Sequence, residues 1–175
     1  MKYHIIVLSF FMSISIVNAQ EINKVDFNEK VQSLDSTIKT LYSIISGSED
    51  KERNWELFKF LFKDDAEITL SINKSTENKT KYYLKVDEFI NTYGKWLKEN
   101  GLYAKETERA ISTFRHMNSV SSTYQYNYYS GGSYQDMNRI NLLKDNNRWY
   151  ISNLKWNQKV SDLVAIKEFL PNKQN

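Results

Sequence analysis

Residues 54–68 read NWELFKFLFKDDAEI and combine two kinds of hydrophobic pattern. The first part carries bulky apolar residues at three- and four-residue spacing, which predicts a helix over residues 51–62 with one buried face. Lys63-Asp64-Asp65 then provides a polar turn, and from Ile68 to Ile72 apolar and polar residues alternate, as expected of a half-buried strand. The stretch therefore predicts a helix that passes through an acidic corner into a β-strand.

Two more helices are predicted on either side of this stretch. An apolar stripe over residues 27–45 stops at Ser46-Gly47-Ser48, and a second stripe covers residues 85–99. Beyond residue 102 the chain becomes rich in Thr, Tyr, Ile and Trp, with turn residues between the segments. The strands predicted there are 103–114, 119–129, 137–144 and 148–156. This order predicts an α+β fold, in which a curved antiparallel sheet wraps around N-terminal helices.

The first residues have the composition of a secretory leader. Lys2 precedes an apolar run over residues 5–17, and small residues end the segment at Ala19. We predict that residues 1–19 are a signal peptide, and that the protein is exported to a periplasmic or extracellular space without staying in a membrane. Residues 20–175 have the size of one domain, so we expect a single domain there.

The composition argues against several classes of function. The chain has 24 Lys and Arg against 21 Asp and Glu and no basic block, so we expect no nucleic-acid partner. The absence of cysteine, with His116 the only histidine after the leader, leaves too few nitrogen and sulfur ligands for zinc. No glycine-rich phosphate loop or dinucleotide fingerprint occurs. We therefore predict neither a metal nor a cofactor.

Two segments carry a family resemblance. Residues 61–68, LFKDDAEI, and residues 147–151, NRWYI, resemble the helix-to-strand corner and the late strand of the nuclear transport factor 2-like superfamily. That superfamily includes ketosteroid isomerase, scytalone dehydratase and SnoaL-type polyketide cyclases, together with noncatalytic binding domains. The resemblance covers most of the chain and implies a cystatin-like cone with an apolar interior, in many members paired into homodimers. We expect an exported, bacterial-type member.

The aromatic residues have two possible roles in such a cone. Apolar stripes on helices usually belong to the core, whereas ligand pockets are also lined mainly by apolar and aromatic groups. For a cone that holds a small apolar or aromatic molecule, the residues expected around the ligand are Tyr42, Trp55, Phe58, Phe62, Phe89, Trp96, Tyr124, Tyr126 and Trp156.

The tyrosine-rich strand suggests either a ligand-binding face or a subunit surface. Tyr124 shares a face with Tyr126, and we expect Arg139 and Asn141 to join that face across a hairpin. Aromatic packing between strands and pairing of two subunits are the alternative uses of this face. Trp149 and Trp156 are seven residues apart and face opposite sides of a regular strand. Both faces of the sheet would then be partly covered, which favours a homodimer through the sheet.

Catalysis has weak support in the sequence. The resemblance places Leu70 where the isomerase branch has its catalytic base, and leucine cannot transfer a proton. A lyase or isomerase of the dehydratase or SnoaL type would instead use His116, with Glu108 or Tyr42 as its partner. Histidines in turns and acids on strands are, however, commonly solvated.

The function that the sequence favours is noncatalytic binding of a small molecule inside the cone. The alternatives are the lyase or isomerase that uses His116, and a dimeric protein-interaction domain.

Overall fold

The computed structural model describes residues 26–73, 79–114, 117–127 and 133–159. The predicted signal peptide and His116 lie outside these residues. In chain order the elements are η1 (Asn28–Val31, a 3-10 helix), α1 (Leu34–Ile45), α2 (Trp55–Phe60), β1 (Phe62–Asn73), β2 (Lys79–Lys85), α3 (Val86–Asn91), α4 (Tyr93–Asn100), β3 (Tyr103–Phe114), β4 (Met117–Asn127), β5 (Ser133–Asp145) and β6 (Arg148–Lys159). Within the described ranges, no helix is long and apolar enough to cross a membrane.

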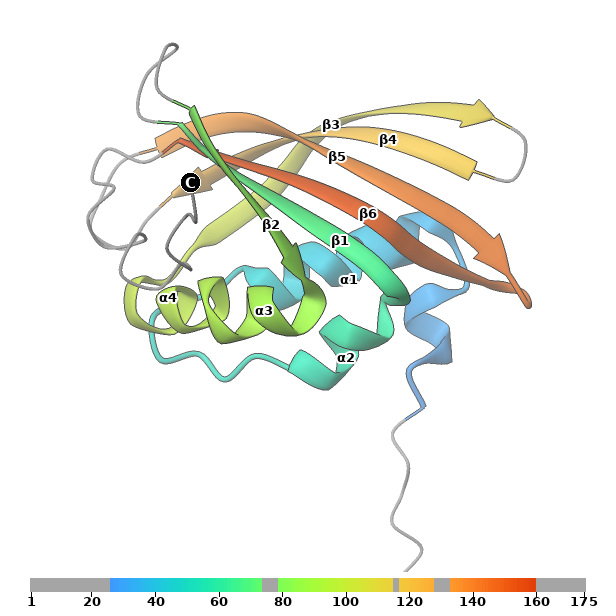
Figure 1. The fold of residues 1–175 in the computed structure, drawn as a ribbon, viewed down its shortest axis with the longest axis horizontal. Helices are drawn as coiled ribbons and strands as arrows, with labels where there is room; N and C mark the ends of the chain where they lie inside the picture. Colours follow the sequence, from blue (N-terminus) through green and yellow to red (C-terminus); the bar gives the residue numbers. More distant parts are fainter. Residues whose placement is uncertain (1–25, 74–78, 115–116, 128–132, 160–175) are drawn as a thin grey trace, which may run out of the picture.

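The strands form a curved sheet in the order β2-β1-β6-β5-β4-β3, and the helices lie along one face of it (Figure 1). We call the face toward the helices the inner face and the opposite one the outer face. Neighbouring strands are antiparallel except β1 and β6, which run parallel. The predicted α+β class is confirmed, and the parallel pair is an addition to the antiparallel sheet that we expected.

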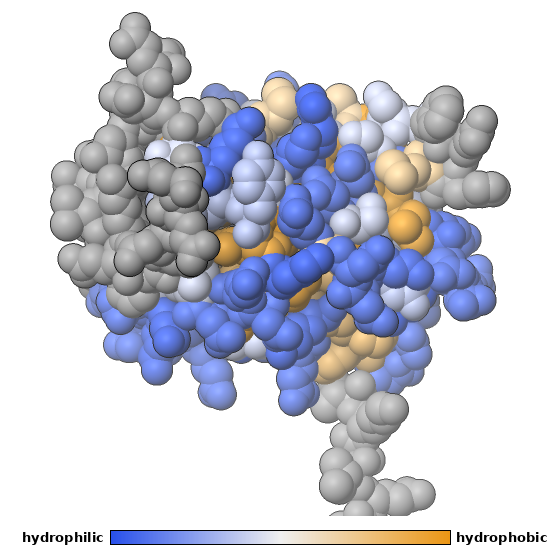
Figure 2. Space-filling view, viewed as in Figure 1, coloured by the Kyte–Doolittle hydropathy of each residue, from blue (hydrophilic) through white to orange (hydrophobic). Residues whose placement is uncertain are grey.

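The core lies between the inner face and the helices. From β1 it takes Ile68, Leu70 and Ile72, each no more than 1% exposed, and from β6 it takes Leu154 and Trp156, both 0% exposed. Figure 2 shows mainly hydrophilic residues over the helices, with hydrophobic residues visible chiefly between the helices and the sheet. The alternation predicted for β1 therefore assigns its faces correctly.

The first predicted helix is divided in two by a cap at Ser33. The Ser33 hydroxyl accepts a hydrogen bond from the Ser36 backbone N–H at 3.0 Å, and the Ser36 hydroxyl accepts one from the Ser33 N–H at 3.1 Å. This capping box starts α1 and separates it from η1. The apolar stripe is buried across the break, with Val31 and Ile38 both 0% exposed.

The acidic corner after α2 belongs to a strand and is not the polar turn that the sequence suggested. Phe62 pairs with Ile151 and Glu67 with Asn153, so β1 has more residues than β6 between these two pairs. Such a bulge bends a strand while it remains in the sheet. The change of direction after α2 is therefore absorbed within β1.

Arg148, at the start of β6, holds this corner in place. Its guanidinium carbon lies 3.7 Å from the centroid of the Phe60 ring and 3.9 Å from that of the Tyr150 ring. Its Nη2 also donates to the Phe60 carbonyl oxygen. Beside it, Lys63 pairs with Asp145 at 2.8 Å. The end of α2 and the start of β1 are thus tied to the β5–β6 hairpin by cation–π contacts, a hydrogen bond and one ion pair.

Two differences from the predicted elements lie between residues 79 and 100. Strand β2 was not expected, yet Leu84 on its inner face is 2% exposed and Tyr83 on its outer face is 64% exposed. The predicted helix over residues 85–99 is divided at Thr92, whose hydroxyl donates to the Glu88 carbonyl at 2.5 Å. A threonine hydroxyl bonded back to the preceding turn competes with the helical hydrogen-bond ladder.

A second bulge changes the faces of β6. The pairing register with β5 shifts between Asn141 and Leu142, and Ile151 and Leu154 are consequently both 0% exposed although they are an odd number of residues apart. Trp149 and Trp156 therefore both pack against the core. Our expectation that these tryptophans face opposite sides is wrong because it assumed a regular strand. The positions of Trp149 and Trp156 therefore give no support for a second subunit on the outer face.

Replacement of Arg148 by alanine should destabilise the fold by about 2 kcal/mol, since a desolvated cation–π contact and a hydrogen bond to the Phe60 carbonyl are both lost. Urea unfolding followed by tryptophan fluorescence measures the change. Arg139→Ala removes the same charge from an exposed site and should stay within about 0.5 kcal/mol of the wild type. Equal effects of the two substitutions would show that the corner does not depend on Arg148.

Candidate functional site

The residues predicted to surround a ligand are mostly packed against one another. Phe58, Phe89, Tyr124 and Trp156 are each 0% exposed. Tyr42, Phe62 and Trp96 are also buried, Trp55 is partly buried, and Tyr126 lies on β4 with a side chain outside the described set. The structure therefore brings eight of the nine predicted side chains to the core between the sheet and the helices.

These rings form two contact clusters. Tyr42, Tyr124 and Trp156 meet beneath the sheet, with ring centroids 5.9 Å apart for Tyr42 and Tyr124 and 5.1 Å apart for Tyr124 and Trp156. In the second cluster Phe58 stacks on Phe89, with ring centroids 5.5 Å apart, and the centroids of Phe58 and Phe62 are 4.9 Å apart. Centroid separations of this size are those of direct ring packing. The depth of the cone is accordingly filled by side chains where these rings lie.

A chain of amide and hydroxyl groups runs from β5 through α1 and β4 to a carboxylate on β3. Asn138 Nδ2 donates to Tyr42 Oη at 3.1 Å, Tyr42 Oη lies 2.8 Å from Ser122 Oγ, and Ser122 Oγ donates to Glu106 Oε1 at 2.7 Å. Because the hydroxyl hydrogen of Ser122 goes to Glu106, the hydrogen between the two hydroxyls must come from Tyr42. The donors therefore all point the same way, toward the carboxylate of Glu106.

The chain ends in a network of charges that reaches the surface. Arg109 Nε donates to Glu106 Oε1 at 2.8 Å, and Arg109 Nη2 donates to Glu106 Oε2. Arg109 Nη1 also lies 3.1 Å from Asp35 Oδ1 on α1, and Asp35 pairs with Lys39 at 2.9 Å. The hydrogen bond from Lys39 lowers the pKa of Asp35, and the hydrogen bond to Glu106 raises the pKa of Arg109. The network thus runs from the buried amide of Asn138 to solvent.

The edge of the cone opens into a hollow beside this network. The hollow has a volume of about 450 Å³ and lies between α1 and β3. Tyr42 and Glu106 line it together with Lys39, Ser43, Ser46, Ala104 and Lys105. It is therefore the place where the polar chain of the interior meets solvent, and we call it the mouth.

Burial makes Tyr42 a weak acid. Desolvation of the phenol raises its pKa to about 12, and the hydrogen bonds to Ser122 and Asn138 only partly offset that rise. The charge of Glu106 raises the pKa further. At neutral pH the Tyr42 hydroxyl is therefore protonated and acts as a hydrogen-bond donor and acceptor.

Other predicted site residues lie elsewhere. Glu108 is exposed on β3, where it pairs with Thr123 of β4, and His116 is outside the described residues. The register between β4 and β5 places Asn138 beside Ser122, and Arg139 beside Ser121 on the outer face. The expectation that Arg139 and Asn141 share a face with Tyr124 is therefore wrong by one residue. A one-residue shift in register exchanges the faces of a strand.

Sequence reasoning missed Asn138 of the polar chain and Arg109 of the charge network. Ser122 lies 80 residues after Tyr42 in the sequence, and Asn138 lies 96 residues after it. No local spacing joins them, and only the strand register brings them together. The pair Glu106–Arg109 has no local signal either, since residues three apart face opposite sides of a regular strand, and only the register shift between Glu106 and Glu108 puts them on one face.

Comparison with solved structures identifies the architecture. A nuclear transport factor 2-like protein from Cytophaga hutchinsonii has a TM-score of 0.53 and is 11% identical, with 68% of this chain and 89% of that one covered. A candidate ketosteroid isomerase from Shewanella frigidimarina has a TM-score of 0.50 at 15% identity, with 69% and 91% covered. The beta subunit of a candidate aromatic-ring-hydroxylating dioxygenase from Novosphingobium aromaticivorans has a TM-score of 0.57 at 8% identity, with 79% and 94% covered.

The chain therefore has the cone fold of the nuclear transport factor 2-like superfamily, as the resemblance at residues 61–68 suggested. No protein-family model matches the sequence, and no curated protein matches it significantly. At these identities the similarity describes the fold, and any activity has to be argued from the residues of this chain.

The stability of the protein should fall between about pH 10 and pH 12 because of Tyr42. Its pKa is 10.0 in an unfolded chain and about 12 in the fold, so the contribution of the buried phenol is complete below pH 10 and is lost as the pH rises to 12. The expected loss is about 3 kcal/mol. Urea unfolding of the wild type and of Tyr42→Phe at several pH values measures this pH-dependent contribution to the free energy of unfolding, which the variant should lack. Parallel pH profiles for the two proteins would contradict the assignment.

Proposed function

We propose that the protein is a noncatalytic binding protein, and that it holds a small apolar or aromatic molecule with a polar group at the mouth of the cone. The observation that carries this proposal is the mouth itself, where an open volume of about 450 Å³ adjoins the polar chain through Tyr42 and Glu106. Such a volume lies within the range of small-molecule sites, roughly 300–1,000 Å³.

The residues around the mouth suit a ligand with one apolar and one polar end. Ala104 and the ring of Tyr42 offer apolar surface, whereas Lys39, Lys105 and Glu106 offer charged groups at the rim. The rings deeper in the cone contact one another, as do Tyr42 and Trp156 with centroids 5.9 Å apart. We therefore propose that the ligand binds at the entrance, and not at the centre of the aromatic cluster as the sequence suggested.

The state of the polar chain favours binding over chemistry. Both carboxylate oxygens of Glu106 are engaged, by Arg109 and by Ser122. A pKa of about 12 keeps Tyr42 from serving as a base near neutral pH. Leu70, at the position of the isomerase base, is 0% exposed and paired across the sheet with Trp156. A polar chain held in one orientation is suited to present the fixed acceptor oxygens of Tyr42 and Glu106 to a ligand.

One further part of the proposal rests on the sequence alone. We propose that residues 1–19 direct export, as their charged start and apolar run suggest. Pairing of two copies through the sheet stays an untested expectation from the sequence and is not part of this proposal, because Trp149 and Trp156 both pack against the core.

Native mass spectrometry and a thermal-shift screen test the binding function. The screen should include steroids, bile acids and aromatic acids, with unfolding followed at a ligand concentration well above the dissociation constant. A ligand at a hundred times its dissociation constant should add about 2.7 kcal/mol of stability, visible as a rise of several degrees in Tm.

Ala104→Trp fills the mouth and should abolish the shift that the best ligand gives. Ala110→Trp introduces the same bulk at an exposed position on the same strand and should leave the shift intact. An equal shift in the wild type and in Ala104→Trp would rule out the mouth as the site. Turnover of the bound compound would contradict the noncatalytic part of the proposal.

A further inference from the structure

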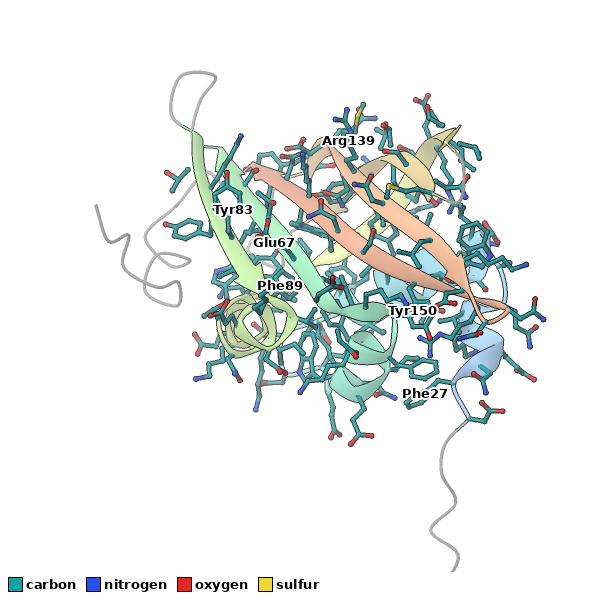
Figure 3. All side chains as sticks on the ribbon, turned by 45° about the vertical axis from the view of Figure 1, so that its right-hand side comes forward. Phe27, Glu67, Tyr83, Phe89, Arg139 and Tyr150 are labelled. Atoms are coloured by element: carbon teal, nitrogen blue, oxygen red, sulfur yellow. The ribbon has the colours of Figure 1, made fainter. Side chains whose placement is uncertain are left out.

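The outer face of the sheet carries a second hollow, about 290 Å³ in volume, on the side away from the helices. Its first row crosses four strands. Thr69 on β1 pairs with Tyr83 of β2 and with Lys155 of β6, and Lys155 pairs with Arg139 of β5. Figure 3 shows Tyr83 and Arg139 standing on β2 and β5, with the other two strands between them.

A second row lies beside the first, two residues along each strand. Ser71 on β1 pairs with Lys81 of β2 and with Asn157 of β6, and Asn157 Nδ2 donates to the Met137 carbonyl of β5. Together the two rows form what we call the trough. It lies on the opposite face from the mouth and depends on none of the mouth residues.

The trough exists because β1 contributes short side chains between the longer ones of β2 and β6. Thr69 and Ser71 form its floor and are 5% and 3% exposed, whereas Tyr83 and Met137 on its walls are 64% and 47% exposed. Among the described residues, neither floor hydroxyl has a side-chain hydrogen bond. Two donors are therefore available at the bottom of the trough.

Among the described residues, three cations line the trough and no carboxylate does. Lys81, Arg139 and Lys155 are all exposed, and within the described part of the chain none of them makes an ion pair. Lys155 and Arg139 are direct cross-strand neighbours, and like charges in that position repel each other. The fold thus keeps an unfavourable pair that an anion between the walls would relieve.

The acids of this face stand outside the trough. Glu67 lies two residues before Thr69 on β1 and is paired across the strands with Lys85. Glu108 lies on β3, beyond Thr123 of β4. The trough is therefore a local positive site on a face that also carries negative charges at its borders.

We propose that the trough binds a small organic phosphate monoester. A phosphate group presents three oxygens in different directions, which suits cations on three strands and hydroxyl donors on a fourth better than a planar carboxylate does. The ring of Tyr83 and the thioether of Met137 offer apolar contacts for the organic part. The volume of about 290 Å³ is near the lower end of small-molecule sites, which suits a ligand as small as a phosphate ester with one ring.

The charge of the trough also decides between this ligand and a second copy of the chain. Two copies paired face to face by a twofold axis through the trough would bring Arg139, Lys155 and Lys81 against the same three cations. Like-charge contacts across an interface disfavour the complex. The outer face is therefore assigned to a phosphorylated ligand, and self-association through it becomes an outcome that would overturn the proposal.

Isothermal titration calorimetry with phenyl phosphate, inorganic phosphate and benzoate tests the assignment, using the purified protein at low and at moderate salt. Phenyl phosphate should bind at least tenfold more tightly than either of the others, and its binding should weaken as salt is raised. The double variant Arg139→Ala, Lys155→Ala should weaken phenyl phosphate binding at least tenfold. Lys30→Ala, an exposed lysine next to α1, should change it less than twofold.

The double variant has a built-in folding control. Removal of two neighbouring like charges should leave the Tm of the ligand-free protein unchanged or raised, while the Tm increase caused by phenyl phosphate is lost. Equal affinity for phenyl phosphate and inorganic phosphate would overturn the organic part of the proposal. Undiminished binding by the double variant, or a dimer in solution that Arg139→Glu dissociates, would overturn the site itself.

Discussion

The hydroxyl of Tyr42 sets the spacing between the first long helix and the sheet. It is buried in an otherwise aromatic cluster, and a buried polar group without partners is costly. Its two partners come from β4 and β5, through Ser122 at 2.8 Å and Asn138 at 3.1 Å. The helix, both strands and the register between them must all be right before this hydroxyl is satisfied. The same contacts also form the site at the mouth, because the chain of hydrogen bonds continues from Ser122 to Glu106 and to solvent.

The sequence predicts elements well where a regular period continues and poorly where a single residue interrupts it. The stripe over residues 27–45 is buried as expected, yet Ser33 starts a new helix within it. Trp149 and Trp156 were assigned to opposite faces because a bulge in β6 leaves no sign in the spacing of apolar residues. Strand β2 was overlooked because Tyr82 and Leu84 are its only clear inward residues and a polar stretch precedes them.

The apolar part of the candidate site was predictable, whereas the partners within its polar part were not. The type and spacing of aromatic residues such as Phe58 and Trp156 predict that they are buried, and both lie in the core. The polar chain and the trough depend on which residues face each other across strands, and that register is a tertiary property. Arg139 illustrates the limit, since its type suggests a ligand contact while its position on the outer face depends on the pairing of β4 with β5.

The position of β6 in the sheet governs the order in which the fold can be completed. Strands β2 and β1 form one hairpin, and β3, β4 and β5 form a meander, but these two parts of the sheet meet only through β6, which pairs with β1 on one side and β5 on the other. The partner of Leu70 is Trp156, so the ladder that closes the sheet joins distant parts of the chain. Pairings over such sequence separations carry a large loop-closure cost and slow folding. A ribosome must therefore have released most of the chain before the core can close, and until then the free edge of β1 stays open to other strands.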